Sequence, residues 1–294
     1  MLPVGEVNRR KGVLVTTAGI VLISPDSLIL RMVGSDPFTL LFTRCGLACF
    51  TLVVLSLLLN RSRGIKQLYR LTRPEWFIAV MFALSTTLFV FAVMNTTVAN
   101  TFVICSVGPL FGAVLSRFFL GEMVAMRTWM AALIIIIGLT IIFSGSLESG
   151  GLVGDCAALL GAIGISAVFV VIRKHPEISM LPALAWSCVF VTITAFPKAE
   201  PSLLTMNDWG LLLLLGVFIL PVAQALMTLG PRYITAPEVS LIQRIEALLA
   251  PLWVWLVLGE VPSKATLLGG ILILVTLVGL ALWAMRDEKH VVAT

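Results

Sequence analysis

Two short segments, Phe118-Phe119-Leu120-Gly121-Glu122 and Leu256-Val257-Leu258-Gly259-Glu260, end two long apolar runs in the same way. They lie 138 residues apart, and each is followed by a few polar residues and then by another apolar run. A Gly-Glu pair alone recurs by chance, but here it falls at the same point in each half of the chain. The spacing therefore predicts a duplicated unit that is built from apolar runs.

The composition places these runs in a membrane. Of the 294 residues, 59% are hydrophobic and 12% are charged, and the mean hydropathy is +1.08. A soluble domain is typically about 45–50% apolar and about 25% charged, so these few charges cannot cover the surface of a soluble fold. The high apolar content also excludes a disordered chain. The sequence predicts an integral membrane protein with no room for a soluble catalytic domain.

Ten runs are long enough to be membrane helices, because crossing the hydrocarbon takes about 20 residues. We therefore predict an all-α bundle of ten transmembrane helices, here called spans one to ten. The predicted spans are residues 13–32, 37–59, 75–94, 98–119, 128–146, 152–172, 180–197, 209–229, 236–258 and 265–285. The two halves are predicted as residues 1–146 and 147–294, forming one transport unit.

The basic residues gather on one side of this bundle. With the N-terminus placed in the cytoplasm, 15 of the 20 Lys and Arg residues fall in cytoplasmic segments, and only Arg31, Lys198 and Lys264 fall in outer ones. This bias follows the positive-inside rule and predicts that both termini are cytoplasmic. It also explains the basic pI of about 9.2 without a nucleic acid partner. The outer segments carry four acids: Glu148, Asp155, Glu200 and Asp208.

The odd number of spans in each half decides how the halves are related. A duplicated five-helix unit must insert the second time with the opposite orientation, so Gly121-Glu122 and Gly259-Glu260 are predicted at opposite faces. A second pair of segments agrees, since residues 12–31 and 154–173 each run from a Gly to an Arg around the first helix of their half. Inverted repeats are typical of secondary transporters, which bind substrate near the midplane between the halves.

The chain resembles the ten-helix EamA branch of the drug/metabolite transporter superfamily over nearly its whole length. The residues that carry the resemblance are Asp36-Pro37 with Arg44, Pro109 with Gly121-Glu122, residues 236–241 (APEVSL), and Glu246 with Gly259-Glu260. One departure is that the family has a proline directly after the glutamate that Glu246 matches. Here Ala247 takes that place and Pro251 follows one turn later.

The resemblance implies export of small metabolites from the cytoplasm across a bacterial inner membrane by alternating access. Residues 232–262, which include 250–255 (APLWVW), look most like the exporters of aromatic amino acids and of amphipathic cations in bacterial inner membranes. We therefore expect small amphipathic substrates, first among them amino acids with apolar or aromatic side chains. The family also implies a cavity among spans 1, 3, 4, 6, 8 and 9. A multidrug or organic cation exporter and a non-transport membrane subunit remain alternatives.

Arg44 and Arg244 are the two basic residues deep within predicted helices. A charge there costs about 2.5–3.5 kcal/mol on insertion scales, so each needs a partner or a watery cavity. For Arg44 we favour a structural or gating contact between helices, and for Arg244 a role in substrate binding. Glu246 is close in sequence, but residues two apart do not share a helix face. As a carboxyl group within the membrane it is a candidate for binding a substrate ammonium and for proton coupling, with helix packing as the alternative.

Further polar residues and prolines are predicted near the midplane. The candidate substrate-binding residues are Arg244, Glu246, Gln243, Gln224, Asn100, Ser24, Ser85 and Thr101. Four prolines are candidates for structural breaks or gating, together with Arg44: Pro25, Pro109, Pro221 and Pro251. Hydroxyl groups in membrane helices often bond only a carbonyl of their own helix, so packing is the alternative for the Ser and Thr residues.

No enzyme motif is present, since the chain lacks GxSxG, HExxH, P-loop and GxGxxG sequences. Glu122 and Glu260 are predicted at opposite faces, so they cannot form a paired-carboxylate site. Five cysteines without a CxxC pair and two isolated histidines predict neither a metal site nor a cofactor. The expected partners are a small-molecule substrate, membrane lipid and, through Glu246, protons.

Overall fold

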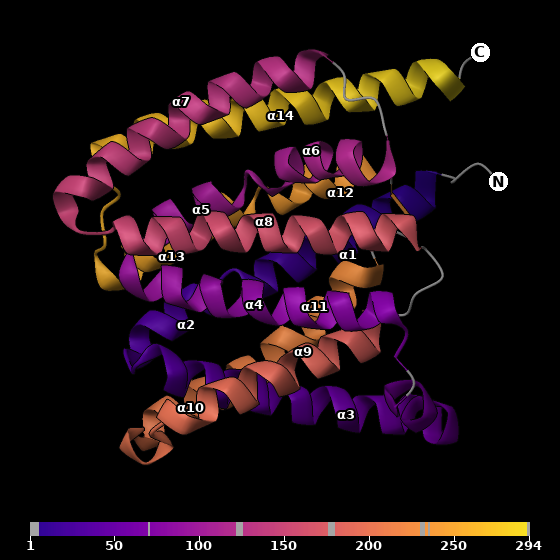
Figure 1. Ribbon diagram of the computed structural model, residues 1–294, viewed down its shortest axis with the longest axis vertical. Coiled ribbons are helices and arrows are strands. Elements are labelled where there is room, and N and C mark those ends of the chain that lie inside the picture. The colour runs from indigo at the N-terminus through magenta and orange to yellow at the C-terminus, as the bar shows by residue number, and fades with distance from the viewer. Residues whose placement is uncertain are drawn as a thin grey trace.

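The computed structural model is a bundle of helices that lie side by side along one direction (Figure 1). It describes residues 6–69, 71–121, 126–175, 180–229, 233–234 and 236–292. These residues form helices and turns and no strands, which confirms the all-α prediction. Within them, nine helical segments are long and apolar enough to cross a membrane, one fewer than predicted.

The predicted span at residues 180–197 is the one that does not meet this criterion. It corresponds to α9 (Met180–Ala195), which is followed by a 3-10 turn, Phe196–Lys198. The 16 residues of α9 make about 24 Å of helix. That length is short of the roughly 30 Å thickness of the hydrocarbon.

Five spans are continuous helices. They are α3 (Pro37–Tyr69), α4 (Arg73–Asn95), α7 (Met126–Ser149), α8 (Leu152–Lys174) and α14 (Lys264–Val292). A capping box sets the start of α4, because Glu75 accepts the backbone N–H of Thr72 at 2.6 Å while the Thr72 side chain caps the helix. The helix α7 continues past residue 146, the predicted end of the first half, as far as Ser149.

Four spans are interrupted near their middle. Span one is α1 (Glu6–Ile23) with α2 (Asp26–Val33), and span eight is α10 (Met206–Leu213), a π-helical turn (Leu214–Ile219) and α11 (Leu220–Leu229). Span four is α5 (Val98–Cys105) with α6 (Gly108–Leu120), and span nine is α12 (Ala236–Gln243) with α13 (Glu246–Leu258). Pro25, Pro109 and Pro221 lie at or just after an interruption, where a missing backbone N–H costs least.

The interruptions of spans four and nine are equivalent. Adding 138 to the bounds of α5 and α6 gives the bounds of α12 and α13. Both α6 and α13 end at a glycine in the left-handed region, Gly121 with φ 71° and Gly259 with φ 69°, where a Cβ atom would be strained. Pro251 differs from the other prolines because α13 runs through it without interruption, so the break in span nine precedes its proline.

The two equivalent spans run in opposite directions. The backbone N–H of Val98, the first residue of α5, donates to Glu260 Oε1 at 2.8 Å, just beyond the last residue of α13. The start of one span therefore lies beside the end of the other, as inverted repeats require. We call this the far end of the bundle, and we call the opposite end, where α1 begins and α14 ends, the terminal end (Figure 1).

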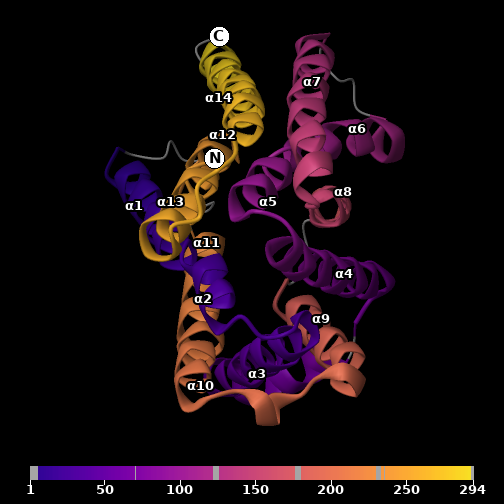
Figure 2. The same ribbon diagram turned by 90° about the vertical axis from the view of Figure 1, so that its left-hand side faces the viewer.

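Two groups of helices face each other when the bundle is viewed along the helices (Figure 2). In the first group α1 and α2 pack with α11, α12 and α13, and in the second group α4, α5 and α6 pack with α8. At the edges α3 pairs with α9 and α7 pairs with α14. Each group combines spans from both halves of the sequence, so the halves are intertwined.

Candidate functional site

The breaks of spans four and nine meet in the middle of the bundle. Arg244, at the break between α12 and α13, donates from Nη1 to the backbone carbonyl oxygen of Ser106 at 2.6 Å. Ser106 lies at the break between α5 and α6, and the N–H of Leu110 donates to Val107 instead of to Ser106. Arg244 thus satisfies a carbonyl that the interrupted helix leaves open. We call the region around these breaks the junction.

Two serines tie further helices to the junction. Ser24, at the break of span one, donates to Val21 O at 2.8 Å and accepts a hydrogen bond from Trp253 Nε1 at 2.9 Å. Ser166 in α8, which matches Ser24 in the second half, donates to Gly108 O at 2.7 Å at the start of α6. Each serine therefore holds the interrupted span beside it, so these hydroxyls have a packing role.

Two acids begin half-helices at the junction. Asp26 is the first residue of α2 and Glu246 is the first residue of α13, where the positive end of the helix dipole favours a carboxylate. The two helices pack together. Asp26, Glu246 and Arg244 are therefore three charged residues that lie at points where the membrane helices are interrupted.

Asp26 also pairs with Arg44 of α3. The Arg44 Nη2 atom donates to Asp26 Oδ2 at 2.5 Å, and the two residues are 6% and 4% exposed. Arg44 thus contacts a neighbouring helix, the kind of contact that the sequence favoured for it. However, Arg44 Nε, Arg44 Nη1 and Asp26 Oδ1 are buried without a hydrogen-bond partner among the described residues. The pair forms one hydrogen bond, whereas a guanidinium and a carboxylate can form two parallel ones.

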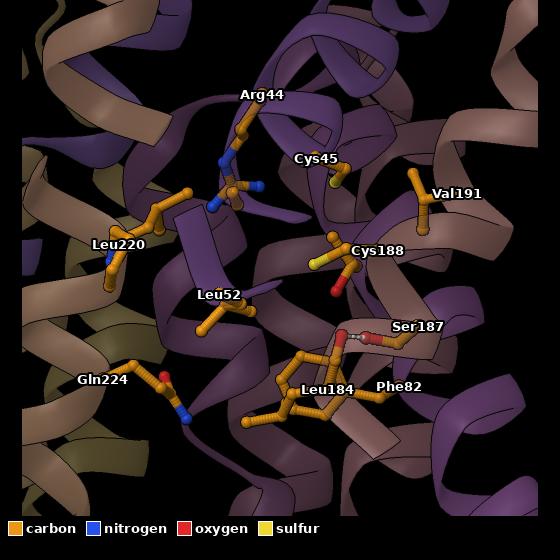
Figure 3. A pocket seen from close by; sticks show the side chains of 13 residues that line it. Arg44, Cys45, Leu52, Phe82, Leu184, Ser187, Cys188, Val191, Leu220 and Gln224 are labelled. Carbon is orange, nitrogen blue, oxygen red and sulfur yellow. Dashed lines mark hydrogen bonds between the residues drawn. The ribbon is translucent and has the colours of Figure 1, made fainter. Parts of the chain in front are cut away.

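A cavity of about 100 Å³ lies beside Arg44 (Figure 3). Arg44 is the charged side chain of its described lining, which otherwise combines apolar residues with Thr86, Ser187, Cys188 and Gln224. The lining comes from α3, α4, α9 and the start of α11, which belong to spans two, three, seven and eight. The placement that the family resemblance implies shares only spans three and eight with it.

The predicted binding residues fall in three places. Gln224, with Pro221, lines the cavity beside Arg44. Arg244, Glu246 and Ser24 lie at the junction, with Gln243 as the last residue of α12. Ser85, Thr101 and Asn100 lie elsewhere. Ser85 donates to Met81 O at 2.8 Å and Thr101 donates to Thr97 O at 3.2 Å, so both bond their own helix turns.

Asn100 belongs to a buried network at the far end, which is centred on Asp155. The Asp155 carboxylate is 0% exposed and accepts from Thr96 Oγ1 at 2.6 Å, Ser146 Oγ at 2.5 Å and Asn100 Nδ2 at 3.1 Å. Thr266 Oγ1 donates to Asn100 Oδ1 at 2.5 Å. Asp155 therefore lies buried in the first turn of α8 at the far end, where the helix N-terminus and several donors offset the cost of burying its charge.

The far end also joins the two groups of helices. Glu260 pairs with Arg31 at 3.5 Å and accepts the N–H of Val98, while Arg31 donates to Thr96 O. Beneath this contact α5 packs against α13, with Ala250 fully buried. At the terminal end the equivalent helices, α6 and α12, make no comparable contact among the described residues. Glu122, the match of Glu260, lies outside the described residues.

Asp26 and Ser106 are site residues that the predicted binding set omits. The repeat offset was the signal for Ser106, because adding 138 to its number gives Arg244. The signal for Asp26 was its charge inside an apolar run, directly after Pro25. Arg44 and Arg244 were singled out by the same criterion, a charge within a predicted membrane helix. Acids within membrane spans are as costly as bases and as informative.

Comparisons with known proteins agree with this architecture. The chain is 27% identical over 206 residues to the Pseudopaline exporter CntI of Pseudomonas aeruginosa (strain UCBPP-PA14), which covers 69% of this chain and 72% of that protein. It is 25% identical over 188 residues to the Uncharacterized transporter YdfC of Bacillus subtilis (strain 168), with 62% and 60% covered. A solved structure described as "Crystal structure of protein" has 18% identity and a TM-score of 0.65 over 92% of this chain and 98% of that chain. It shows a shared fold.

The model of the EamA-like transporter family matches this chain twice, over residues 12–144 and 152–282. The first match ends inside α7 and the second begins at the first residue of α8, close to the point where one set of five predicted spans ends and the next begins. The protein is therefore a multi-pass membrane protein of a transporter family rather than an enzyme. The chain belongs to the EamA-like transporter family.

Proposed function

We propose that the protein is a secondary transporter that exports small amphipathic metabolites from the cytoplasm by alternating access. The observation that carries the proposal is the unequal packing of the two interrupted spans. At the far end α5 packs against α13, whereas α6 and α12 make no comparable contact within the described chain. Inverted repeats exchange such arrangements by rocking around a central site, which exposes the site first at one end and then at the other.

The terminal end is the cytoplasmic end in this proposal, in a bacterial inner membrane. The basic residues support this orientation, since Arg9, Arg117, Arg173 and Lys174 lie in segments of the terminal end. The bacterial relatives support the membrane, and the name of one relative, a pseudopaline exporter, supports the direction of transport. An exporter binds its substrate from the cytoplasm while its outer end is closed, and in this orientation the closed far end is the outer end.

Amino acids with apolar or aromatic side chains are the proposed substrates. Such a molecule carries an ammonium group, which can donate a hydrogen bond to Glu246, and a carboxylate, which can accept hydrogen bonds from a buried arginine. The amides of Gln224 and Gln243 are neutral partners, and the apolar walls of the cavity suit the side chain. An organic cation exporter remains the alternative, because Asp26 and Glu246 place two acids at the junction.

The test is counterflow in proteoliposomes with a panel of labelled amino acids and organic cations. Liposomes that contain an excess of unlabelled phenylalanine should accumulate labelled phenylalanine, and protein-free liposomes should not. Accumulation of cations without amino acids would select the cation exporter. If no member of the panel accumulates, the proposed substrates are wrong.

The same assay tests Glu246 and proton coupling. We expect Glu246→Gln to slow phenylalanine counterflow roughly tenfold to a hundredfold, the effect of losing a charge-assisted hydrogen bond. A pH gradient should change net transport by the natural protein but not the residual transport by this variant. Glu200→Gln, at an exposed acid of the far end, is the matched control. Transport that ignores both the gradient and the substitution would remove proton coupling through Glu246.

A second prediction concerns the closed far end. Replacing Glu260 with Gln should raise the rate at which a maleimide labels a cysteine placed at Ala250, which is fully buried in the core cluster that contains residues of both α5 and α13. The side chains of Arg31 and Glu260 are 24% and 23% exposed, so we expect only a twofold to fivefold increase, roughly the effect of a partly exposed ion pair. The five native cysteines are first replaced by serine.

Glu200→Gln in the same background is the control for this labelling experiment, because Glu200 is an exposed acid of the same region. It should leave the labelling rate at Ala250→Cys unchanged. Equal labelling rates with Glu260→Gln and Glu200→Gln would show that Glu260 does not hold the far end closed.

A further inference from the structure

Arg44 carries donors that the protein itself does not use. Its guanidinium is buried, yet Nε and Nη1 have no hydrogen-bond partner within the described chain. A charged donor left unsatisfied in a low dielectric is costly, so such a group indicates a ligand or water that completes it. Asp26 bonds only Nη2 and keeps its own Oδ1 without a partner among the described residues. The arginine fork is therefore only partly occupied.

The side chain of Arg44 reaches into the cavity. Figure 3 shows its guanidinium directed toward the space between Leu52, Leu220 and Cys188, with Gln224 across the cavity. A volume of about 100 Å³ holds several waters or a small solute. The walls are mainly apolar, so the cavity fits a molecule that has an apolar body and one anionic group.

We propose that Arg44 is the subsite for the substrate carboxylate, and that Asp26 is an internal competitor which holds the same guanidinium while the cavity is empty. The inference rests on the proposed function for its substrate and decides which buried arginine receives the anion. Arg244 already donates from Nη1 to Ser106 O, whereas Arg44 lines the cavity and its Nη1 has no hydrogen-bond partner in the described residues.

An incoming carboxylate accepts from Nη1, next to the Nη2 atom that Asp26 uses. Two carboxylates on one guanidinium repel each other, so filling the cavity weakens the hold of Asp26 on Arg44. The consequence reaches the far end because Asp26 begins the eight-residue helix α2 and Arg31, near its other end, contacts Glu260 and Thr96. Substrate binding in the cavity thereby loosens α2, whose Arg31 contacts Glu260 and Thr96 at the far end.

The first test is a calorimetric titration of the purified full-length protein with 3-phenylpropanoate and with its uncharged amide, 3-phenylpropanamide. We expect the carboxylate to bind at least roughly tenfold more tightly than the amide, since only the carboxylate forms a charge-assisted hydrogen bond. Arg44→Gln should weaken carboxylate binding roughly tenfold to a hundredfold. Arg44→Lys should fall in between, because it keeps the charge but loses the fork.

The substitution Asp26→Asn is the decisive test, because the direction in which it changes carboxylate affinity separates the two interpretations. It removes the competing charge while its amide oxygen still accepts from Nη2, so carboxylate binding should become roughly tenfold tighter. A pair that only locks α2 to α3 would lose binding in both variants, and that result would overturn the proposal. Equal binding of the amide and the carboxylate would overturn it too. If Arg44→Gln does not give a single gel-filtration peak, Arg44→Lys and Asp26→Asn decide the question.

Phenylalanine counterflow by the same preparations separates this inference from the proposed function. Counterflow by the natural protein, with equal losses in Arg44→Lys and Asp26→Asn, leaves amino acid export standing and removes the Arg44 subsite. If the two substitutions change carboxylate binding in opposite directions but no amino acid counterflow occurs, the Arg44 subsite is supported and amino acid export is contradicted.

Discussion

Replacing Gly269 with Val in α14 should prevent most of the protein from accumulating in a folded form. At this point α14 crosses α7, and a Cβ atom on Gly269 would lie 2.5 Å from Gly138 O and 2.7 Å from Ile142 Cγ1. A backbone oxygen cannot rotate away, so the two helices would have to separate. Overpacking costs typically about 1–3 kcal/mol and occasionally more, and small residues are what permit such close helix crossings in membranes.

Gly279 is the matched control on the same helix. A Cβ atom at Gly279 has no heavy atom within 4 Å, so Gly279→Val should leave the folded yield unchanged. The measurement is the monodisperse fraction after gel filtration in detergent, together with the thermal unfolding midpoint of the protein that is recovered. Equal yields and midpoints for Gly269→Val and Gly279→Val would show that α7 and α14 do not cross at this point.

The features that the sequence predicted depend on local signals. The lengths of the apolar runs gave the membrane class, and the repeated Leu-Gly-Glu segments gave equivalent helix ends, because a glycine after an apolar run is a local C-cap signal. Gly121 and Gly259 both take the left-handed conformation that ends α6 and α13. Local patterns suffice here because each helix end is decided by a few neighbouring residues.

The features that the sequence missed depend on contacts between distant residues. The break in span nine lies at Arg244, seven residues before Pro251, and there the Arg244 side chain binds a carbonyl in the other half of the chain. The cavity and the unused donors of Arg44 likewise depend on how α3, α4, α9 and α11 pack. A single sequence shows which residues are unusual, but not which partners they find.

Asp155→Ala should destabilise the protein at least as much as Gly269→Val, because it removes an acceptor that three donors share. The substitution leaves the Thr96 and Ser146 hydroxyls and the Asn100 amide in a buried site without that acceptor. Leaving a buried donor unsatisfied costs about 1–3 kcal/mol, and three donors lose this acceptor together. Asp155→Asn should be intermediate, since it keeps one acceptor oxygen. The measurement is the unfolding midpoint in detergent, and Glu200→Ala, at an exposed acid, should leave it unchanged.

Equal midpoints for Asp155→Ala and Glu200→Ala would contradict the network. The same series decides the role of Asn100, which the sequence suggested as a substrate-binding residue. If Asn100 serves the network, Asn100→Ala lowers the midpoint, and the double variant with Asp155→Ala loses less than the sum of the single losses, because both remove the same hydrogen bonds. If Asn100 binds substrate, Asn100→Ala slows counterflow and leaves the midpoint in place. Asn100 donates from Nδ2 to Asp155 and accepts at Oδ1 from Thr266, so both ends of its amide group are already occupied, which favours the first outcome.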